Sequence, residues 1–390
     1  MKIQSIEQHP VTYHAIKEGW SDTAGHHNYE FWPANIPSII IEIQTSNGLT
    51  GIGEAPVEHW YYGNTLEHNS KVLKLYEKRI KNEDPINLNR IEKILDGVMS
   101  RGAPSAKPSK DATVTALLDI IGQARSEPIY NLLGGALQTE FLLMTNLYLD
   151  TANAMAEQAV KFVKGGYTGL KIKCGMEVEE KGWSLNNAKS DLAKLVKALE
   201  VTPDTIYVDA DFNQSFGSAH RAISLVRAYD LEKYGNLSLE QPTGYLDLEG
   251  ASKITRAITL PLVLDETIFS AKMMIEVVRR AAADRICLKP SRVGGLMEAR
   301  RIIAIAEAAE IGIGLDHVPC SKIGDSALCH IAATVREPYP ICADLSTWIK
   351  ENPVKHGGVT WDNGQAKLPS KSGLGIELNR DILEEIELKG

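Results

Sequence analysis

Carboxylates and lysines recur at the ends of short apolar segments in the second half of the chain. The stretch 205-TIYVDADFNQSF-216 places Asp209, Asp211 and Asn213 on one face of a strand, because side chains in a strand alternate between faces. Two carboxylates held side by side repel each other unless a cation lies between them. Taken alone, this stretch fits a solvated Asp/Asn turn as well, so the other strand ends must decide between a metal site and a turn.

The polar residues at the other strand ends follow an order: lysines, then acidic positions, then a lysine again. They are Lys171 and Lys173, Asp209 or Asp211 with Asn213, Glu240, Asp265 with Glu266, and Lys289. One carboxylate from each of three consecutive strands would meet around a hard cation such as Mg²⁺, which prefers oxygen ligands. Beside that cation and a second lysine, the pKa of a partly buried lysine would fall from about 10.4 toward neutrality. Such a lysine can remove a proton from carbon.

The elements that must position these residues are short apolar strands alternating with amphipathic helices. The strand candidates are 141–149, 168–174, 205–211, 236–242, 261–266, 285–290, 311–317 and 340–345. This alternation is typical of parallel β/α units, so we expect an α/β fold with a (β/α)8-type barrel. The C-terminal ends of barrel strands converge on one face, where the lysines of the second and sixth strands would lie opposite each other.

An α+β capping domain is expected beside the barrel, formed by the N-terminal segment and the C-terminal tail. Residues 1 to about 60 predict antiparallel strands joined by an Asn-Gly turn, and helical periodicity follows. We expect the capping domain to comprise 1–132 plus 356–390 and the catalytic barrel to comprise 133–355. The long aromatic loop 17–33 is expected to be a lid over the site.

The motifs at the strand ends resemble those of the enolase superfamily, specifically its muconate lactonizing enzyme subgroup. The matching segments are 171-KIK-173, 211-DFN-213, 240-EQP-242, 265-DE-266 and 289-KPSRVGG-295, with 51-GIGEAP-56, 128-PIYNLLGG-135 and 373-GLGIEL-378 in the capping part. The resemblance implies that Lys173 and Lys289 are the acid/base pair and that Lys171 tunes Lys173. It also implies that Asp211, Glu240 and Asp265 bind Mg²⁺, with Asp211 preferred over Asp209 because it begins the DxN pattern.

Other residues are candidates to support the ligands or to contact substrate. They are Asp209, Asn213, Glu266, Asp316, His317, Asp344, Trp348, Trp20, Tyr29, Trp32 and Tyr61. Aromatic faces suit a cationic ammonium group, and Asp316 and Asp344 would pair with the same cation. The aromatics would equally well pack the cap against the barrel, and His317 is as readily a structural histidine. One departure from the family pattern is the segment 174–204, which is longer than one loop and helix require.

The metal and two lysines together indicate abstraction of the proton α to a substrate carboxylate, through an enediolate. Lysines on both faces favour racemisation or epimerisation, and the resemblance favours a proline-like or N-modified amino acid as substrate. The alternatives are a dehydratase of a β-hydroxy acid or hydroxyproline-type substrate, a cycloisomerase, or a catalytically silent metal-binding scaffold.

Composition excludes several other classes of function. The 390-residue chain has a net charge of −8, which favours neither nucleic acid nor an anionic membrane as a partner. Its five cysteines lack CxxC spacing and its N-terminal residues lack the apolar run of a signal peptide, which predicts reduced thiols and a cytoplasmic location. We expect a small-molecule carboxylate substrate and a homo-oligomeric protein.

Overall fold

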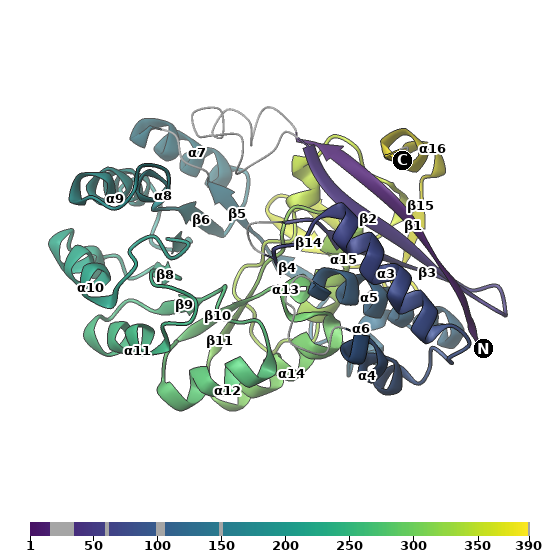
Figure 1. Cartoon of the computed structure of the whole chain (residues 1–390). Helices are drawn as coiled ribbons and strands as arrows, with labels where there is room; N and C mark the ends of the chain where they lie inside the picture. The colour runs from purple at the N-terminus through teal and green to yellow at the C-terminus, as the bar shows by residue number, and fades with distance from the viewer. Residues whose placement is uncertain (16–34, 59–61, 99–105, 148–150, 389–390) are drawn as a thin grey trace.

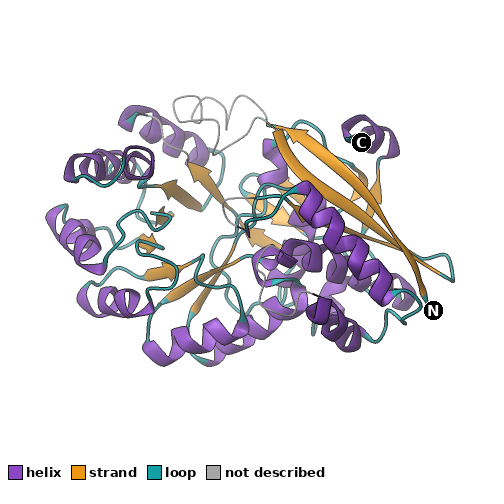
Figure 2. Ribbon diagram, in the orientation of Figure 1, coloured by secondary structure: helices purple, strands orange, loops and turns teal. Residues whose placement is uncertain are grey.

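The computed structural model describes residues 1–15, 35–58, 62–98, 106–147 and 151–388. It has two parts, a curled parallel sheet lined by helices and a separate capping part with an antiparallel sheet (Figures 1 and 2). The expected α/β class with an α+β cap is thereby confirmed. Within the described ranges, every helix is too short or too polar to span a bilayer.

The capping sheet has the antiparallel order β1-β2-β3 and is covered by helices on one face. Its elements are β1 (Ile3–His14), β2 (Asn35–Thr45), β3 (Thr50–Pro56), α3 (Leu66–Ile80), α4 (Leu88–Val98), α5 (Lys107–Arg125) and α6 (Ile129–Leu132). Strand β3 packs against α5 through two glycines. A Cβ atom on Gly51 or Gly53 would lie about 2 Å from a carbonyl oxygen of α5, so only glycine permits this close approach.

The barrel sheet contains seven parallel strands in the order β11-β10-β9-β8-β7-β6-β5. These strands are β5 (Met144–Leu147), β6 (Gly169–Lys173), β7 (Tyr207–Asp211), β8 (Leu237–Glu240), β9 (Leu262–Leu264), β10 (Arg285–Leu288) and β11 (Gly312–Leu315). The helical elements that follow them are α7 (Ala152–Lys164), α8 (Met176–Lys181), α9 (Leu185–Leu199), α10 (Ala219–Ala228), η3 (Leu231–Lys233), α11 (Leu248–Ala257), α12 (Ala271–Arg280), α13 (Pro290–Val293), α14 (Leu296–Ala308) and α15 (Lys322–Ala332). Two helices, α8 and α9, fill the interval between β6 and β7, which explains why that segment is long.

The prediction of a regular eighth strand at 340–345 is wrong, although this segment does lie between β11 and β5, where an eighth strand would lie. It joins β11 through Tyr339 N–H to Ile313 O at 3.0 Å, and β5 through Met144 N–H to Ile341 O at 3.0 Å. Only isolated bridges form on either side. Pro338 and Pro340 have no amide hydrogen to donate to a ladder, which explains the irregular pairing. The sheet is closed by these bridges.

The first predicted strand, 141–149, forms two separate strands, β4 (Glu140–Leu142) and β5. The chain after the eighth segment contributes elements to both the barrel side and the capping part. Strand β4 leaves the barrel sheet and pairs with β14 of a terminal hairpin. The remaining elements are η4 (Leu345–Trp348), β12 (Val354–Gly357), β13 (Thr360–Asp362), β14 (Gln365–Lys367), β15 (Ile376–Leu378) and α16 (Arg380–Ile386). Helix α16 packs against β1, so both ends of the chain lie on the capping side (Figure 1).

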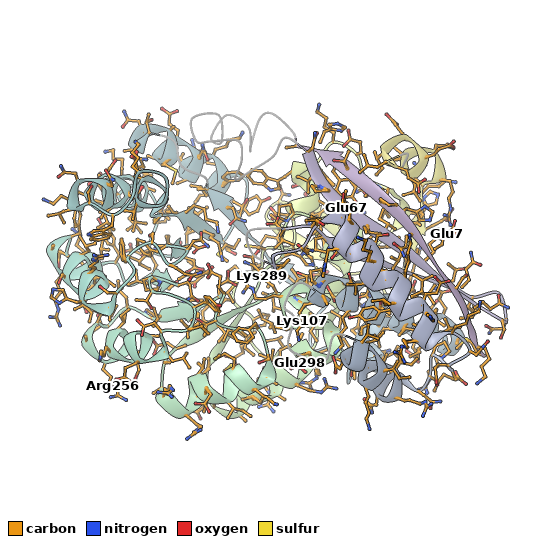
Figure 3. The ribbon with its side chains drawn as sticks, in the orientation of Figure 1. Glu7, Glu67, Lys107, Arg256, Lys289 and Glu298 are labelled. Carbon is orange, nitrogen blue, oxygen red and sulfur yellow. The ribbon has the colours of Figure 1, made fainter. Side chains whose placement is uncertain are left out.

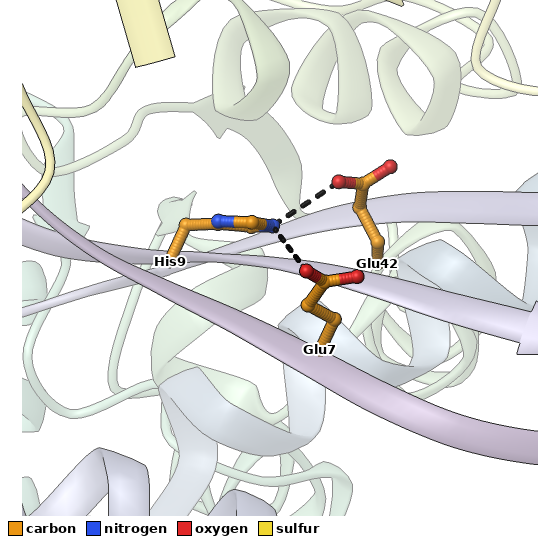
Figure 4. A group of neighbouring side chains, drawn as sticks. All are labelled: Glu7, His9 and Glu42. Carbon is orange, nitrogen blue, oxygen red and sulfur yellow. Dashed lines mark hydrogen bonds and ion pairs between the residues drawn. The ribbon is translucent and has the colours of Figure 1, made fainter. Parts of the chain in front are cut away.

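A buried histidine fastens α16 and the residue after it to the capping sheet. The Nε2 atom of His9 lies 3.1 Å from Glu42, and its Nδ1 atom lies 3.1 Å from Glu387. Figure 4 shows the ring directed toward Glu42 and, at 4.0 Å, toward Glu7. Arg380 of α16 donates two hydrogen bonds to Glu42. We call His9, Glu42, Arg380 and Glu387 the C-terminal latch.

The barrel and cap are joined by a carboxylate at the start of α15. Glu54 of β3 accepts hydrogen bonds from the Tyr13 hydroxyl at 2.9 Å and from the Ser321 hydroxyl at 2.6 Å. It also accepts from the backbone N–H groups of Ser321 and Gly324. Because a helix N-terminus presents unpaired N–H groups and partial positive charge, a carboxylate of the cap stabilises a barrel helix here.

Candidate active site

Strand β6 places two lysines inside the barrel, two residues apart and on the same face. Every residue of β6 is buried, including both lysines. Lys171 Nζ lies 2.7 Å from both carboxylate oxygens of Glu240 and 3.2 Å from Asp316 Oδ2. Lys173, nearer the strand end, pairs with Asp211 and donates to Asn213 Oδ1 at 3.4 Å. A buried lysine is stable only with such partners.

The two aspartates of β7 have different neighbours. Asp211 binds Lys173 through Oδ2, and its Oδ1 accepts the backbone N–H of Asn213 at 3.0 Å. Asp209 lies one step deeper, where its Oδ1 accepts the Ser238 hydroxyl at 2.8 Å and its Oδ2 lies 3.7 Å from Lys171. Both carboxylates face the barrel interior, as the alternation of the strand predicts. Only Asp211 lies at the strand end.

Three carboxylates reach the same end of the barrel from the consecutive strands β7, β8 and β9. Asp211 and Glu240 are register partners in neighbouring strands, and Asp265 directly follows β9. Ligand atoms of Glu240, Asp265 and Cys287 all lie within 4.8 Å of one another, whereas Asp211 is turned toward Lys173 and is outside this group. Burial raises the pKa of Glu240 well above its usual value, and the negative charge of Asp209 is the second cause of this rise.

This donor set fits a hard divalent cation. Crowded buried carboxylates carry negative charge that a cation would neutralise, and carboxylate oxygens are the ligands Mg²⁺ prefers. Burial raises the pKa of the Cys287 thiol well above its usual value, so the sulfur stays protonated and is a poor ligand. Glu240 and Asp265 are the oxygen donors that lie together here, and Asp211 stays the third predicted ligand.

The second lysine position lies at the end of β10, near the centre of the molecule where the barrel meets the capping elements (Figure 3). Lys289 Nζ lies 2.8 Å from Asp265 Oδ2 and 3.1 Å from Asp316 Oδ2. Arg292, one turn further on, binds Asp265 through both its carboxylate and its backbone carbonyl. Asp265 is thus held between two cationic side chains.

The pKa shifts of the lysines run opposite to the direction expected from the sequence. Burial lowers the pKa of Lys289, but Asp265 and Asp316 outweigh it and hold that pKa well above the usual value. Burial likewise lowers the pKa of Lys171, and Cys287, Glu240 and Asp316 raise it further than burial lowers it. The sequence expectation applies to a lysine beside a cation that neutralises these carboxylates. A cation bound to the same carboxylates would remove the cause of the shift.

The further candidate residues divide into those at this barrel end and those elsewhere. Glu266 accepts from the amides of Asn213 and Gln214 at 3.3 Å. Asp316 joins Lys171 to Lys289, and the lysines hold its pKa below the usual range although burial raises it. Asp344 accepts the Tyr167 hydroxyl at 2.7 Å.

Two other candidates have structural contacts of their own. His317 Nδ1 lies 2.9 Å from the Val318 carbonyl, and burial lowers its pKa to about 4, so the ring stays neutral. Trp348 stacks on Phe162 with ring centroids 6.4 Å apart. Trp20, Tyr29, Trp32, Tyr61 and the expected lid 17–33 lie outside the described residues.

Sequence reasoning missed three residues that the structure brings to the site. Arg292 lies within the quoted KPSRVGG motif, and its spacing from Lys289 by one helical turn was the available signal. Glu58 follows β3 and is buried beneath the cap. Tyr62, four residues later, contacts the Ser291 hydroxyl at 2.9 Å. No local pattern marks Glu58 or Tyr62, because they approach the barrel only after the two parts associate.

Comparison with known proteins assigns the chain to a family. Residues 154–382 match the family model described as Enolase C-terminal domain-like. Residues 34–134 match the model of the Mandelate racemase / muconate lactonizing enzyme, N-terminal domain. Together these matches span both the barrel and the cap.

Similar proteins of known activity cover nearly the whole chain. N-succinyl-L-Arg/Lys racemase of Bacillus cereus is 27% identical over 90% of this chain and 91% of its own. Hydrophobic dipeptide epimerase of Enterococcus faecalis is 31% identical over 87% and 91%. Cis-3-hydroxy-L-proline dehydratase of Roseibium aggregatum is 27% identical over 89% and 90%.

Solved structures of two of these proteins share the fold. The Bacillus cereus racemase superposes with a TM-score of 0.87 at 25% identity, covering 100% of this chain and 99% of its own. The Enterococcus faecalis epimerase, complexed with Mg and the dipeptide L-Leu-L-Tyr, gives 0.83 at 29% identity, covering 97% and 100%. The chain therefore belongs to the enolase superfamily, in its muconate lactonizing enzyme subgroup, and is an enzyme of that superfamily.

Proposed function

We propose that the protein binds Mg²⁺ through Asp211, Glu240 and Asp265 and racemises or epimerises an amino acid derivative, proline-like or N-modified, by removing the proton α to its carboxylate. The observation that carries this proposal is the order of the strands. Lys173 on β6 and Lys289 after β10 stand on the two sides of the strands that bear the three carboxylates. A substrate carboxylate anchored in the middle would present its α-carbon between two lysines.

Each lysine has one task in this scheme. A neutral lysine on one side removes the α-proton, and the ammonium group on the other side returns a proton to the opposite face. A bound divalent cation would stabilise the negative charge that develops on the substrate carboxylate. Asp316 lies 3.1 Å from Lys289 and 3.2 Å from Lys171, so it holds these two amines in place. Arg292 holds Asp265.

The proposal is tested by isotope exchange at the α-carbon. The enzyme is incubated with Mg²⁺ in D₂O with proline-like and N-substituted amino acids, and deuterium is followed by NMR and mass spectrometry. We expect exchange with inversion. Lys173→Ala and Lys289→Ala should each abolish turnover and retain exchange only from the enantiomer whose proton faces the remaining lysine. Lys253→Ala, on the exposed face of α11, is the matched control.

Two results would redirect the proposal. Loss of water from a hydroxylated substrate, in place of inversion, would assign a dehydratase, which the similarity to cis-3-hydroxy-L-proline dehydratase makes the second candidate. If one lysine variant lost exchange from both enantiomers while the other behaved as wild type, a single base would act and racemisation would be refuted. Absence of exchange with every substrate would refute proton abstraction itself.

A further inference from the structure

The carboxyl group of Glu58 is placed at the boundary between cap and barrel by a short network. The backbone N–H of Glu58 donates to Asn64 Oδ1 at 3.0 Å, and Asn64 in turn donates to the Pro56 carbonyl at 2.9 Å. The Glu58 carbonyl accepts the backbone N–H of Tyr62 at 2.8 Å. The Tyr62 hydroxyl then contacts Ser291, two residues beyond Lys289. These contacts fix Glu58 against the end of β10 from the cap side.

The side chain of Glu58 lacks the partners that neighbouring carboxylates have. Only 3% of the residue is exposed, and its Oε2 atom finds no hydrogen-bond donor among the described residues. Burial raises its pKa to about 8, and the charges of Lys289 and Lys173 oppose that rise. The positive charges of both lysines therefore act on the Glu58 carboxyl group, and these lysines flank the proposed substrate position.

Two other carboxylates at this end, the half-buried Glu266 and the buried Asp344, also have one unpartnered oxygen among the described residues, yet each accepts hydrogen bonds through its other oxygen. Glu266 accepts two side-chain amides, and Asp344 accepts a tyrosine hydroxyl. Among the described residues, the hydrogen bonds of Glu58 involve its backbone alone. Glu58 also comes from the cap, whereas the other two belong to the barrel. It therefore belongs to a different part of the molecule from the carboxylates that would hold the metal.

The unpartnered oxygen indicates what kind of substrate group belongs beside it. A buried carboxylate that lacks a donor is unfavourable, and a ligand that supplies an N–H donor relieves that cost. A substrate nitrogen bearing positive charge would be repelled by Lys173 and Lys289 unless a carboxylate lay close to it. Glu58 meets both requirements in its ionised form, which a bound cationic nitrogen would favour by lowering its raised pKa. A neutral N-acyl group has no such need of a negative charge.

We propose that Glu58 binds a positively charged, N–H-bearing nitrogen of the substrate and thereby selects cationic amino acids over their N-acylated counterparts. This inference rests on the proposed function for its choice of substrates, which are carboxylates with an α-hydrogen. It adds the residue that distinguishes between the two nitrogen chemistries. Glu58 would contact the substrate without taking part in proton transfer.

The experiment compares Glu58→Gln and Glu58→Asp with wild type on matched pairs of substrates. Each pair has one skeleton in a charged and an acylated form, such as proline with N-acetylproline and lysine with its Nε-acetyl derivative. For the charged members, Glu58→Gln should lower kcat/KM by ~10–100-fold, mainly through KM, because a hydrogen bond to a charged group is lost. Acylated members should change by less than about threefold. Glu58→Asp, which retains the charge, should recover part of the loss.

Binding without turnover separates this inference from the proposed reaction. The α-methyl analogues of the same pairs have no α-proton, so calorimetry with Mg²⁺ present reports affinity alone. Wild type should bind the charged analogues, and Glu58→Gln should weaken that binding by the same factor. Failure of α-exchange with preserved binding would refute the reaction and leave the role of Glu58 standing. Exchange of acylated substrates alone would support the reaction and overturn the role of Glu58.

Two controls complete the design. Glu67→Gln removes an exposed carboxylate from the same part of the cap and should leave both affinities unchanged. The unfolding temperature of Glu58→Gln should equal or exceed that of wild type, because the variant loses a buried carboxyl group with an unpaired oxygen. Equal losses for charged and acylated ligands, wild-type behaviour of Glu58→Gln, or no binding of any charged analogue to wild type would each overturn the inference.

Discussion

At the scale of single residues, two aspartates of one strand differ because neighbouring strands provide them with different partners. Asp209 and Asp211 share a strand face and a residue type, but Ser238 holds the first and Lys173 meets the second. Asp209 lies below the strand end, where it lies beside Lys171. Asp211 lies at the strand end, beside Lys173. Depth within the barrel therefore distinguishes a supporting carboxylate from a candidate ligand.

We predict that the two aspartates differ in their effect on metal binding. Asp211→Asn should weaken Mg²⁺ binding by more than ~100-fold, because a charged ligand is lost, whereas a residue that only supports ligands typically costs less. Asp209→Asn keeps an oxygen for Ser238 and should cost less than about tenfold. Isothermal titration calorimetry measures both. Full affinity in Asp211→Asn with none in Asp209→Asn would show that the deeper aspartate is the ligand.

A second prediction concerns Arg292, which orients Asp265. Arg292→Met should lower Mg²⁺ affinity by ~10–100-fold, because the carboxylate loses the guanidinium that holds it in position. Arg292→Lys should recover only part, since lysine lacks the planar fork of donors. Arg227→Met, which removes an exposed guanidinium bonded to a backbone carbonyl, is the matched control. Unchanged affinity in Arg292→Met would leave Arg292 with no role in the site.

Much of the fold and of the candidate site could be predicted from the sequence, and the failures have common physical causes. The alternation of apolar strands with helices, and the polar residue at each strand end, are local signals that predicted the barrel and the site-facing side chains. The eighth segment departs from a regular strand because two prolines interrupt its hydrogen bonding. The lysine pKa shifts, Glu58 and Tyr62 depend on contacts between distant segments, which local periodicity does not encode.

At the scale of elements, α16 is held to the cap by charged groups as well as by its buried Leu383 and Ile386. Hydrogen bonding to Glu42 and Glu387 raises the pKa of His9 above its usual 6.5, against the effect of burial. Burial raises the pKa of Glu42, but Arg380 and His9 outweigh it and lower that pKa from 4.5 to about 2. The two shifts have opposite signs, so the C-terminal latch has an optimum pH.

We predict that the latch is tightest between about pH 4.5 and 6.5. The contribution of His9 is fully present below 6.5 and is lost as pH rises through its raised pKa. The contribution of Glu42 is present above 4.5 and is lost as pH falls toward about 2. Hydrogen exchange of α16 amides, corrected for intrinsic rates, should be slower at pH 5.5 than at pH 8.5.

Substitution of the histidine tests the source of that pH dependence. His9→Gln should remove the difference between the two pH values and should leave α16 exchanging rapidly at both. His356→Gln, an exposed histidine on β12, should behave as wild type. A pH dependence of α16 that survived in His9→Gln would place its origin in another group.

At the scale of the whole molecule, the cap and barrel associate through buried polar contacts. Each of these contacts needs one group from the cap and one from the barrel. Glu54 of the cap accepts hydrogen bonds from two N–H groups and a hydroxyl at the start of α15. Tyr62 reaches Ser291 at the end of β10. The site therefore lies where the two parts meet, and its geometry depends on their association.

We predict that Glu54→Gln lowers the free energy of unfolding by about 2–3 kcal/mol, because a carboxylate that accepts several hydrogen bonds is replaced by a neutral group with one acceptor oxygen. Urea denaturation followed by circular dichroism measures the loss. Glu67→Gln on the cap surface should change stability by less than about 0.5 kcal/mol. An equally small effect of Glu54→Gln would show that the carboxylate contributes little to holding the two parts together.

The C-terminal latch also affects how the chain folds during synthesis. His9 is synthesised 378 positions before its partner Glu387. The outer contacts of strand β1 therefore form only after the whole barrel between these two residues has been translated. A nascent chain can close its barrel while its first strand still lacks α16. The cap is therefore completed only when α16 becomes available, after all the barrel strands.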